Sequence, residues 1–249
     1  LDTSLVEKML ETAVFNAHTE FANRPRPLAA VLQQVANGRF SLGQYQESAE
    51  IQHRAVELMR TSFGPKSKEF LRASYSQALN LFRMGKYDRA SEMLQECIDK
   101  SSEWPAVQAN CLHTLSQVLI NQDDLKQALR LINRALEIET KESGIVSLNK
   151  IRMLNSRSQI YASQNELELA AKDIEGVVQA RINLLGADNY ETSTAYLNLG
   201  VVRRKQNRLE EAIALYTKTL EIRSKLLESD HPKILTIHNN MGTAYRSGG

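Results

Sequence analysis

Apolar residues recur every three or four positions along most of the chain, and residues 194–222 give the clearest example. The apolar positions of this stretch are Tyr196, Leu199 and Val202, followed by Leu209, Ile213, Tyr216 and Leu220. Such spacing places one apolar stripe on a helix, which must be buried against another element. Residues 205–208 between the two halves are all polar, and Asn207 tolerates the left-handed backbone that ends a helix. The stretch therefore predicts two helices joined by a tight turn.

The same pattern recurs along the chain at a nearly fixed period. Aligned on the turn, six residues fall in one register at intervals of 42, 38, 42, 42 and 42 residues: Gly43, Gly85, Asp123, Asn165, Asn207 and Gly249. Repeats of this length are typical of a solenoid, in which each helical hairpin buries its apolar face against its neighbours.

Small side chains follow each turn at two fixed distances. Five residues after the turn stand Ser48, Ala90, Ala128, Ala170 and Ala212. Twelve residues after the turn stand Ala55, Cys97, Ala135, Val177 and Thr219. Small or slender residues at these steps allow the second helix of each hairpin to approach its neighbours closely, so we expect both positions to be buried.

Several of these residues carry a resemblance to a known family. Leu199 and Gly200, with Leu209, Ala212 and Tyr216, resemble the tetratricopeptide repeat, as do Leu32, Gly43, Tyr45 and Ala55. The linkers at 184–190 and 226–232 resemble the LG-x-DHP segment of the longer kinesin-light-chain type of repeat, with Ser62-Phe63-Gly64-Pro65 a looser match. The resemblance covers residues 28–249. It implies an all-α fold, a right-handed superhelical solenoid of antiparallel helix hairpins (an alpha-alpha superhelix).

The repeat register predicts how the chain is divided. Residues 1–27 form a capping helix or half-repeat, with a helix over 3–22 that Pro25 and Pro27 end, because proline lacks the amide proton a helix interior needs. The array occupies 28–249, with units at about 28–67, 68–105, 106–145, 146–188 and 189–232 and a half-repeat at 233–249. This last half-repeat has no partner helix. We expect it to expose Ile234, Ile237 and Met241, which would permit self-association.

Composition narrows the class of function. The 249 residues include 31 basic and 29 acidic ones, a balance that argues against nucleic-acid binding. No apolar run approaches the roughly 18 residues of a membrane span, so we expect a cytoplasmic protein that does not bind membranes. Cys97 and Cys111 are predicted to be reduced and buried, with a disulfide or a redox role as the open alternatives. The chain begins at Leu1 instead of Met, which suggests a fragment excised from a longer protein.

Catalytic chemistry has little support in the sequence, so we predict no enzyme activity for this chain and no cofactor. It contains no Gly-rich phosphate loop, no H-E-x-x-H and no paired C-x-x-C motif. His113 and Cys111 are two apart on a helix and face different directions, which argues against a metal site. The basic run 203–205 with Arg208 is interpreted as a helix end answered by Glu210 and Glu211, not as an RNA site. Trp104, the single tryptophan, is expected either to pack against neighbouring helices or to lie partly exposed as a contact residue.

The resemblance implies that the first helix of each hairpin lines an inner surface on which ligands bind. Counted from the same starting point in each first helix, 36 positions face inward. None of them is Asp or Glu, although roughly four would be expected by chance, and six are Arg or Lys. The candidate partner-binding residues among them are Arg72, Tyr75, Arg83, Asn110, His113, Gln117, Arg152, Asn155, Gln159, Asn198, Arg204, Asn239 and Arg246.

This lining predicts a non-catalytic interaction module for a protein or peptide partner. Asn and Gln both donate and accept hydrogen bonds, which suits a peptide main chain, and Arg pairs with carboxylates. An acidic partner segment is therefore the preferred hypothesis, and the alternative is that any solvated groove is polar. Two other roles stay open: the C-terminal regulatory or docking repeats of a bacterial serine/threonine kinase, which the order of helix, proline-rich break and repeats resembles, and a peptide-pheromone sensor.

Overall fold

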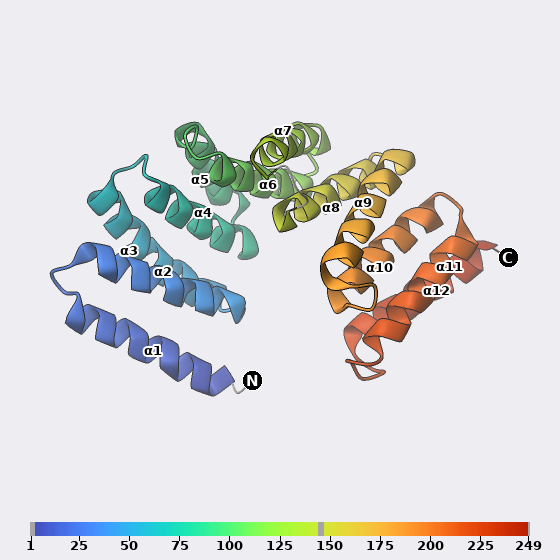
Figure 1. Ribbon diagram of the computed structural model, residues 1–249, viewed down its shortest axis with the longest axis horizontal. Helices are drawn as coiled ribbons and strands as arrows, with labels where there is room; N and C mark the ends of the chain where they lie inside the picture. Colours follow the sequence, from blue (N-terminus) through green and yellow to red (C-terminus); the bar gives the residue numbers. More distant parts are fainter. Residues whose placement is uncertain (1–2, 144–146, 249) are drawn as a thin grey trace. The chain divides into compact units, whose positions relative to one another are not determined.

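The computed structural model describes residues 3–143 and 147–248, and within them all regular secondary structure is helical (Figure 1). These residues divide into two compact units between Glu142 and Ser143. The helices of the first unit are α1 (Thr3–Glu20), α2 (Pro25–Ser41), α3 (Tyr45–Phe63), α4 (Lys68–Arg83), α5 (Tyr87–Lys100), α6 (Pro105–Asn121) and α7 (Leu125–Ser143). Those of the second unit are α8 (Leu148–Ser163), α9 (Leu167–Leu185), α10 (Tyr190–Lys205), α11 (Leu209–Arg223) and α12 (Pro232–Gly248).

Consecutive helices pack as hairpins within each unit. In the first unit α2 packs on α3 and α4 on α5, and in the second α8 packs on α9 and α10 on α11. Within a unit, successive hairpins contact each other through α3 and α4, α5 and α6, or α9 and α10. In the first unit α4 also contacts both α2 and α6. The predicted all-α architecture of sequential helix hairpins is confirmed. Among the described helices, none has the length and apolar character needed to cross a membrane.

The tight turns have the predicted backbone conformation. The φ angles are 77° at Gly43, 72° at Gly85, 64° at Asp123, 63° at Asn165 and 61° at Asn207. All five lie in the left-handed region, where glycine costs nothing and Asn or Asp costs little, so each chain reversal takes only a few residues. The sixth turn residue, Gly249, lies outside the described residues, as does Val146, where the fourth unit was expected to begin.

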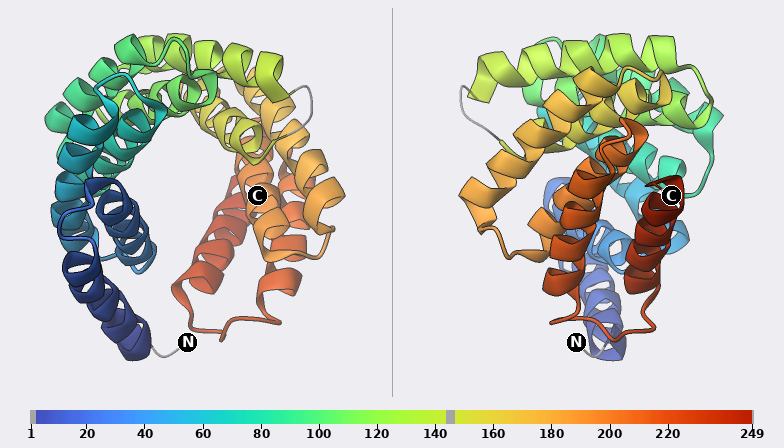
Figure 2. Two further views of the ribbon diagram at one scale, coloured as in Figure 1. Left: turned by 60° about the vertical axis from the view of Figure 1, so that its left-hand side comes forward. Right: turned by 90° about the vertical axis from the view of Figure 1, so that its right-hand side faces the viewer.

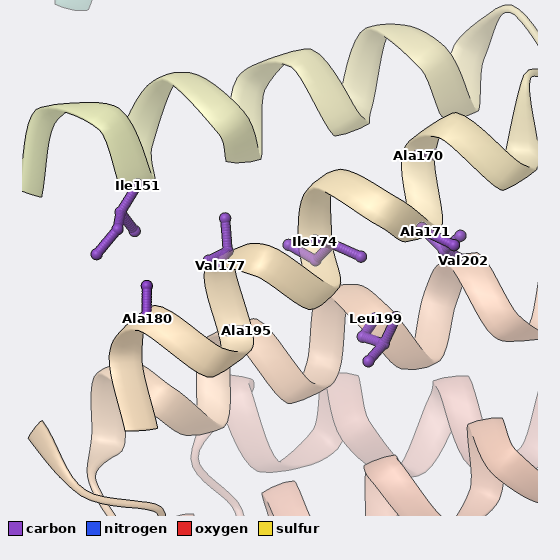
Figure 3. Packing of buried hydrophobic residues seen from close by; sticks show 9 residues of the cluster. All are labelled: Ile151, Ala170, Ala171, Ile174, Val177, Ala180, Ala195, Leu199 and Val202. Carbon is purple, nitrogen blue, oxygen red and sulfur yellow. The ribbon is translucent and has the colours of Figure 1, made fainter. Parts of the chain in front are cut away.

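The two small-residue positions after each turn are buried in every repeat. All ten side chains are at most 1% exposed, from Ser48 and Ala55 in the first repeat to Ala212 and Thr219 in the fifth. In the second unit Ala170 and Val177 of α9 lie in a cluster with Ile151 of α8 and with Leu199 and Val202 of α10 (Figure 3). The second helix of the hairpin thus forms the middle of the core, and its small side chains let both neighbours approach it.

The prolines near the N-terminus lie inside a helix, in contrast to the sequence-based expectation. α1 ends at Glu20, and α2 already begins at Pro25, with Pro27 in its first turn. The first amides of a helix have no partner within the helix, so a proline there loses no hydrogen bond, and its fixed φ suits the helix. The break therefore occupies residues 21–24, and the prolines mark the start of the next helix.

The expected exposure of the last helix was wrong for two of its three residues. Ile234 is 2% and Ile237 0% exposed, because both pack against Tyr216 and Ala212 of α11, and Met241 is partly buried beside them. α11 and α12 lie side by side (Figure 2). The apolar stripe of α12 faces the preceding hairpin. The large apolar residues that α12 exposes are Leu235 and Tyr245.

Candidate functional site

A groove of about 710 Å³ lies in the first unit between the first helices of three hairpins, α2, α4 and α6. Its lining residues are Ala30, Gln33, Gln34 and Asn37 of α2, Met59 of α3, Lys68, Glu69, Arg72, Tyr75 and Ser76 of α4, and Ala106, Val107 and Asn110 of α6. Arg72, Tyr75 and Asn110 among the candidate residues are therefore brought together. The inward face of the first helices forms a real concavity here.

Hydrogen bonds to the buried side chain of Gln52 hold part of the amide lining in place. Gln33 and Gln52 exchange reciprocal side-chain hydrogen bonds at 2.8 Å, and Gln33 Nε2 also donates to Asn37 Oδ1 at 3.1 Å. Gln52 is fully buried on α3 and donates to the Ala73 carbonyl at 3.0 Å. The Gln33 amide is thereby held in one orientation, whereas Asn110 is half-buried and Gln34 is exposed at the groove surface.

The charged groups of the groove are two cations and one carboxylate. Arg72, Lys68 and Glu69 are exposed on α4, and no ion pair joins any of them to another described residue. Glu69 adds an acidic group to a lining that the sequence predicted to hold none. Lys68 Nζ lies 5.5 Å from the ring centroid of Trp104, whose Nε1 donates to the Lys66 carbonyl at 3.1 Å.

Four lining residues lie one helical turn before the inward positions that the sequence predicts. Lys68 and Glu69 lie four and three positions before Arg72, and Ala106 and Val107 stand in the same relation to Asn110. Residues three and four apart share a helix face, so extending the stripe by one turn would have found all four.

Comparison with known proteins identifies the architecture. The tetratricopeptide repeat profile matches residues 28–102, 150–225 and 191–249, which together cover more than half of the chain. The chain belongs to the tetratricopeptide repeat family. No curated protein sequence matches this tetratricopeptide repeat protein.

Solved structures share its fold at low sequence identity. BtubC (BKLC) from P. vanneervenii is 19% identical, with a TM-score of 0.75 over 89% of this chain and 92% of that one. The TPR-like repeats of a putative kinesin light chain from Podosopora anserina are 16% identical, with a TM-score of 0.65 over 83% and 99%. YrrB, described as a TPR protein with an unusual peptide-binding site, is 17% identical, with a TM-score of 0.51 over 91% and 97%. The predicted resemblance to tetratricopeptide repeats, including kinesin-light-chain-like ones, is confirmed for the fold.

Three other candidates in the first unit of this tetratricopeptide repeat protein do not line the groove. Arg83 is exposed near the end of α4, with its Cζ atom 5.8 Å from the Phe82 ring centroid. His113 is only 9% exposed within α6, and Gln117 is half-buried one turn further along the same helix.

The two cysteines are both free thiols and both buried, as predicted. Cys97 Sγ donates to the Leu71 carbonyl at 3.8 Å. Burial, together with the neighbouring Cys97 thiol, raises the pKa of Cys111 far above its ordinary value. A buried, protonated thiol is a poor nucleophile and a poor metal ligand, so Cys111 contributes packing.

The second-unit candidates are spread over three helices. Asn198 Nδ2 of α10 donates to Asn155 Oδ1 of α8 at 2.8 Å, which joins two of them. Arg204 is half-buried, and its Nε atom has no hydrogen-bond partner among the described residues. The remaining candidates are exposed: Arg152, Gln159, Asn239 and Arg246.

The basic run at the end of α10 is engaged in ion pairs within the protein. Arg203 is 7% exposed and pairs with Glu175 of α9 and, at 3.2 Å, with Glu211 of α11. Arg208 pairs with the same Glu211 at 2.6 Å. These contacts confirm Glu211 as an acidic partner of this helix end, whereas Glu210 forms no ion pair in the described part of the chain.

Proposed function

We propose that this tetratricopeptide repeat protein binds an extended segment of a partner protein or peptide in the groove between α2, α4 and α6, and that it prefers an acidic segment. The observation that carries the proposal is the lining itself: side-chain amides from α2 and α6 face the two cations and Tyr75 of α4. Proteins of this family typically mediate protein interactions, and the structural relative YrrB is described as having a peptide-binding site.

The groove offers two kinds of interaction to an extended chain. Gln34 and Asn110 can exchange hydrogen bonds with the amide and carbonyl groups of a peptide, which need partners once they leave water. Lys68 and Arg72 lie one turn apart on the same helix, so their charges add within the groove. Glu69 lies beside them and disfavours a second carboxylate there. A ligand with one acidic side chain opposite Arg72 therefore fits better than a uniformly acidic one.

Titration calorimetry with matched peptides tests this proposal. Two peptides of equal length, differing only in Glu or Lys at the charged positions, are titrated at low and high salt. We expect the acidic peptide to bind more tightly and the difference to shrink as salt rises, because salt screens charges exposed to solvent. Equal affinities for the two peptides would contradict the proposed preference for acidic segments. If neither peptide bound, the proposal that the groove binds peptides would be wrong.

Two arginines on α4 provide a matched pair of variants. Arg72 lines the groove and Arg83, three turns further along the helix, does not, although both are exposed. Arg72→Ala should weaken binding of the acidic peptide by about 1 kcal/mol, roughly fivefold, and Arg83→Ala should leave it unchanged. Equal losses in the two variants would indicate a general charge effect without a defined site.

A kinase docking region or a peptide-pheromone sensor would use the same groove. The two alternatives differ in the ligand: a docking region takes a segment of a larger protein, whereas a sensor takes a free short peptide with its own terminal charges. Comparing one peptide with free and with blocked termini separates them, because only a terminal recognition site loses affinity on blocking.

A further inference from the structure

Two arginines in equivalent positions of successive repeats have different surroundings. Arg181 and Arg223 are 42 residues apart, each near the end of a second helix, and Glu191 and Lys233 are also 42 apart, each near the start of the following first helix. Arg181 Nη1 pairs with Glu191 Oε2 at 3.0 Å. One repeat later, the residue at the position of Glu191 is Lys233, so a cation replaces the carboxylate in the repeat register.

Arg223 is a buried cation that contacts hydroxyl groups and an aromatic ring. It is 4% exposed; its Nε atom donates to Ser193 Oγ at 3.0 Å and its Nη2 atom to Thr194 Oγ1 at 2.9 Å. Its Cζ atom lies 5.0 Å from the ring centroid of Tyr190, and Lys233 Nζ lies 5.1 Å from the same centroid. Two cations therefore share one ring.

Neither cation has an acidic partner in the described part of the chain. The ion pairs found there include no contact of Arg223 or Lys233 with a carboxylate. The Nη1 atom of Arg223 also makes no hydrogen bond to a described residue. A buried charge is costly unless it is paired, and two like charges near one ring repel each other. The Tyr190 ring attracts both cations but neutralises neither.

We propose that Arg223 and Lys233 form a binding site for an oxyanion, the phosphate or carboxylate group of a ligand. The site lies where the end of α11 meets the starts of α10 and α12 (Figure 2). The Ser193 and Thr194 hydroxyls accept from Nε and Nη2 and hold the guanidinium in place, which leaves its Nη1 donors for an oxygen of the ligand. Lys233, which is exposed, supplies the second positive charge. In the preceding repeat Glu191 fills the equivalent place, so that repeat has no such site.

Anion-dependent stability of the whole 249-residue chain tests the proposal. The midpoint of thermal unfolding is measured with increasing inorganic phosphate and, separately, with acetate, while chloride keeps the ionic strength constant. Phosphate stabilises many proteins without binding a defined site, so the comparison between variants decides the question. Lys233→Glu supplies the carboxylate that the preceding repeat has, and Lys172→Glu makes the same charge change at an exposed position on α9 that lacks ion pairs in the described structure.

We expect Lys233→Glu to unfold at a higher temperature than the wild type without phosphate and to lose most of the phosphate-dependent shift. Lys172→Glu should keep that shift. The part of the shift that Lys233→Glu loses identifies the ligand: a phosphate group if this part is larger with phosphate than with acetate, and a carboxylate if it is larger with acetate. Equal phosphate shifts in the wild type and in Lys233→Glu would overturn the proposal.

A spectroscopic readout covers the case in which Lys233→Glu does not fold. The Arg223 Nε–H signal, assigned by its absence in Arg223→Lys, is followed by NMR during the phosphate titration. In the wild type this signal should shift and saturate, and in Lys233→Gln it should shift several-fold less at equal phosphate concentrations. An unchanged Arg223 signal in the wild type would overturn the proposal.

Discussion

Gly200 of α10 faces the ring of Tyr216 of α11 so closely that a side chain would collide with it. A Cβ atom on Gly200 would lie 2.6 Å from Cε1 and 2.9 Å from Cδ1 of Tyr216. Tyr216 is fully buried and packs with Ala212 and Ile237. Packing therefore explains the glycine of the Leu-Gly pair in the repeat motif: the Tyr216 ring occupies the space that a side chain at position 200 would need.

Gly200→Ala should destabilise the protein. Overpacking a rigid core costs about 1–3 kcal/mol, whereas replacing a helical glycine by alanine gains about 1 kcal/mol. We therefore expect a net loss of up to about 2 kcal/mol in the free energy of unfolding, measured with urea. Gly176→Ala is the matched control, because Gly176 is exposed on α9 and a methyl group added there would meet no atom outside the local helix within 4 Å. That variant should be stabilised by up to about 1 kcal/mol, and equal effects at both positions would contradict the packing argument.

Tyr216→Phe should lose less stability at high pH than the wild-type protein does. Burial raises the pKa of Tyr216 above its ordinary value, and the nearby Arg204 guanidinium offsets part of this rise. The unfolded chain then loses the tyrosine proton at lower pH than the folded chain, so stability is full below about pH 10 and falls as the pH rises further. Phenylalanine has no proton to lose, and the difference between wild type and variant should grow above pH 10.

At neutral pH the same variant should be at least as stable as the wild type. The Tyr216 hydroxyl is buried and, although the Arg204 guanidinium lies near it, makes no hydrogen bond of normal geometry to a described residue, so removing it removes a poorly satisfied polar group. The free energies of unfolding of both proteins, measured at pH 7 and at several values above pH 9, check both statements. A loss above about 1 kcal/mol at pH 7 would show that the hydroxyl has a stabilising partner.

Asp173→Asn should cost far more stability than a similar change on the surface. Arg157 of α8 holds Asp173 of α9 by two bonds, Nε to Oδ2 at 2.7 Å and Nη2 to Oδ1 at 2.8 Å, and the Asp173 side chain is 8% exposed. The substitution removes the charge that pairs with a partly buried guanidinium through two hydrogen bonds. Because the Arg157 side chain is 24% exposed, we expect a loss of about 2–4 kcal/mol, below the full range for a deeply buried pair.

Asp188→Asn provides the control for this prediction. Asp188 pairs with Lys218 at 2.8 Å, but both side chains are well exposed, and water and salt screen such a pair. Urea unfolding of the two variants under the same conditions should show a large loss for Asp173→Asn and little change for Asp188→Asn. Similar losses in both would mean that the Arg157–Asp173 pair contributes no more than a surface contact.

The repeat register could be predicted from the sequence because it depends on local chemistry. A left-handed turn favours Gly, Asn or Asp, and close helix packing favours small side chains. These residue types therefore recur at fixed intervals in the sequence, where they can be recognised. Asn165 and Ala170 illustrate the two constraints: one has a φ of 63°, and the other is fully buried.

The site was less predictable because its residues depend on contacts across helices. The polarity of Glu69 and Lys68 does not show whether they face the groove or open solvent; only the packing of α2 and α6 on either side decides it. The burial of Ile234 also differs from the expectation. The sequence shows the apolar stripe of this helix but not which helix covers it, and in the structure α11 does. Arg223 and Lys233 stand out in the sequence only by comparison with the equivalent residues one repeat earlier, where the second residue is a carboxylate.

Trp104 should report on ligand binding in the groove. It is the only tryptophan in the chain, and the ammonium group of Lys68, a groove residue, lies near its ring. A peptide carboxylate that pairs with Lys68 changes the electric field at the indole, so the fluorescence emission should shift saturably during titration with the acidic peptide. Lys68→Met, which keeps the apolar stem and removes the charge, should reduce the shift without abolishing binding, because Arg72 still provides a cation. Peptide binding detected by calorimetry with unchanged Trp104 emission would place the peptide outside this groove.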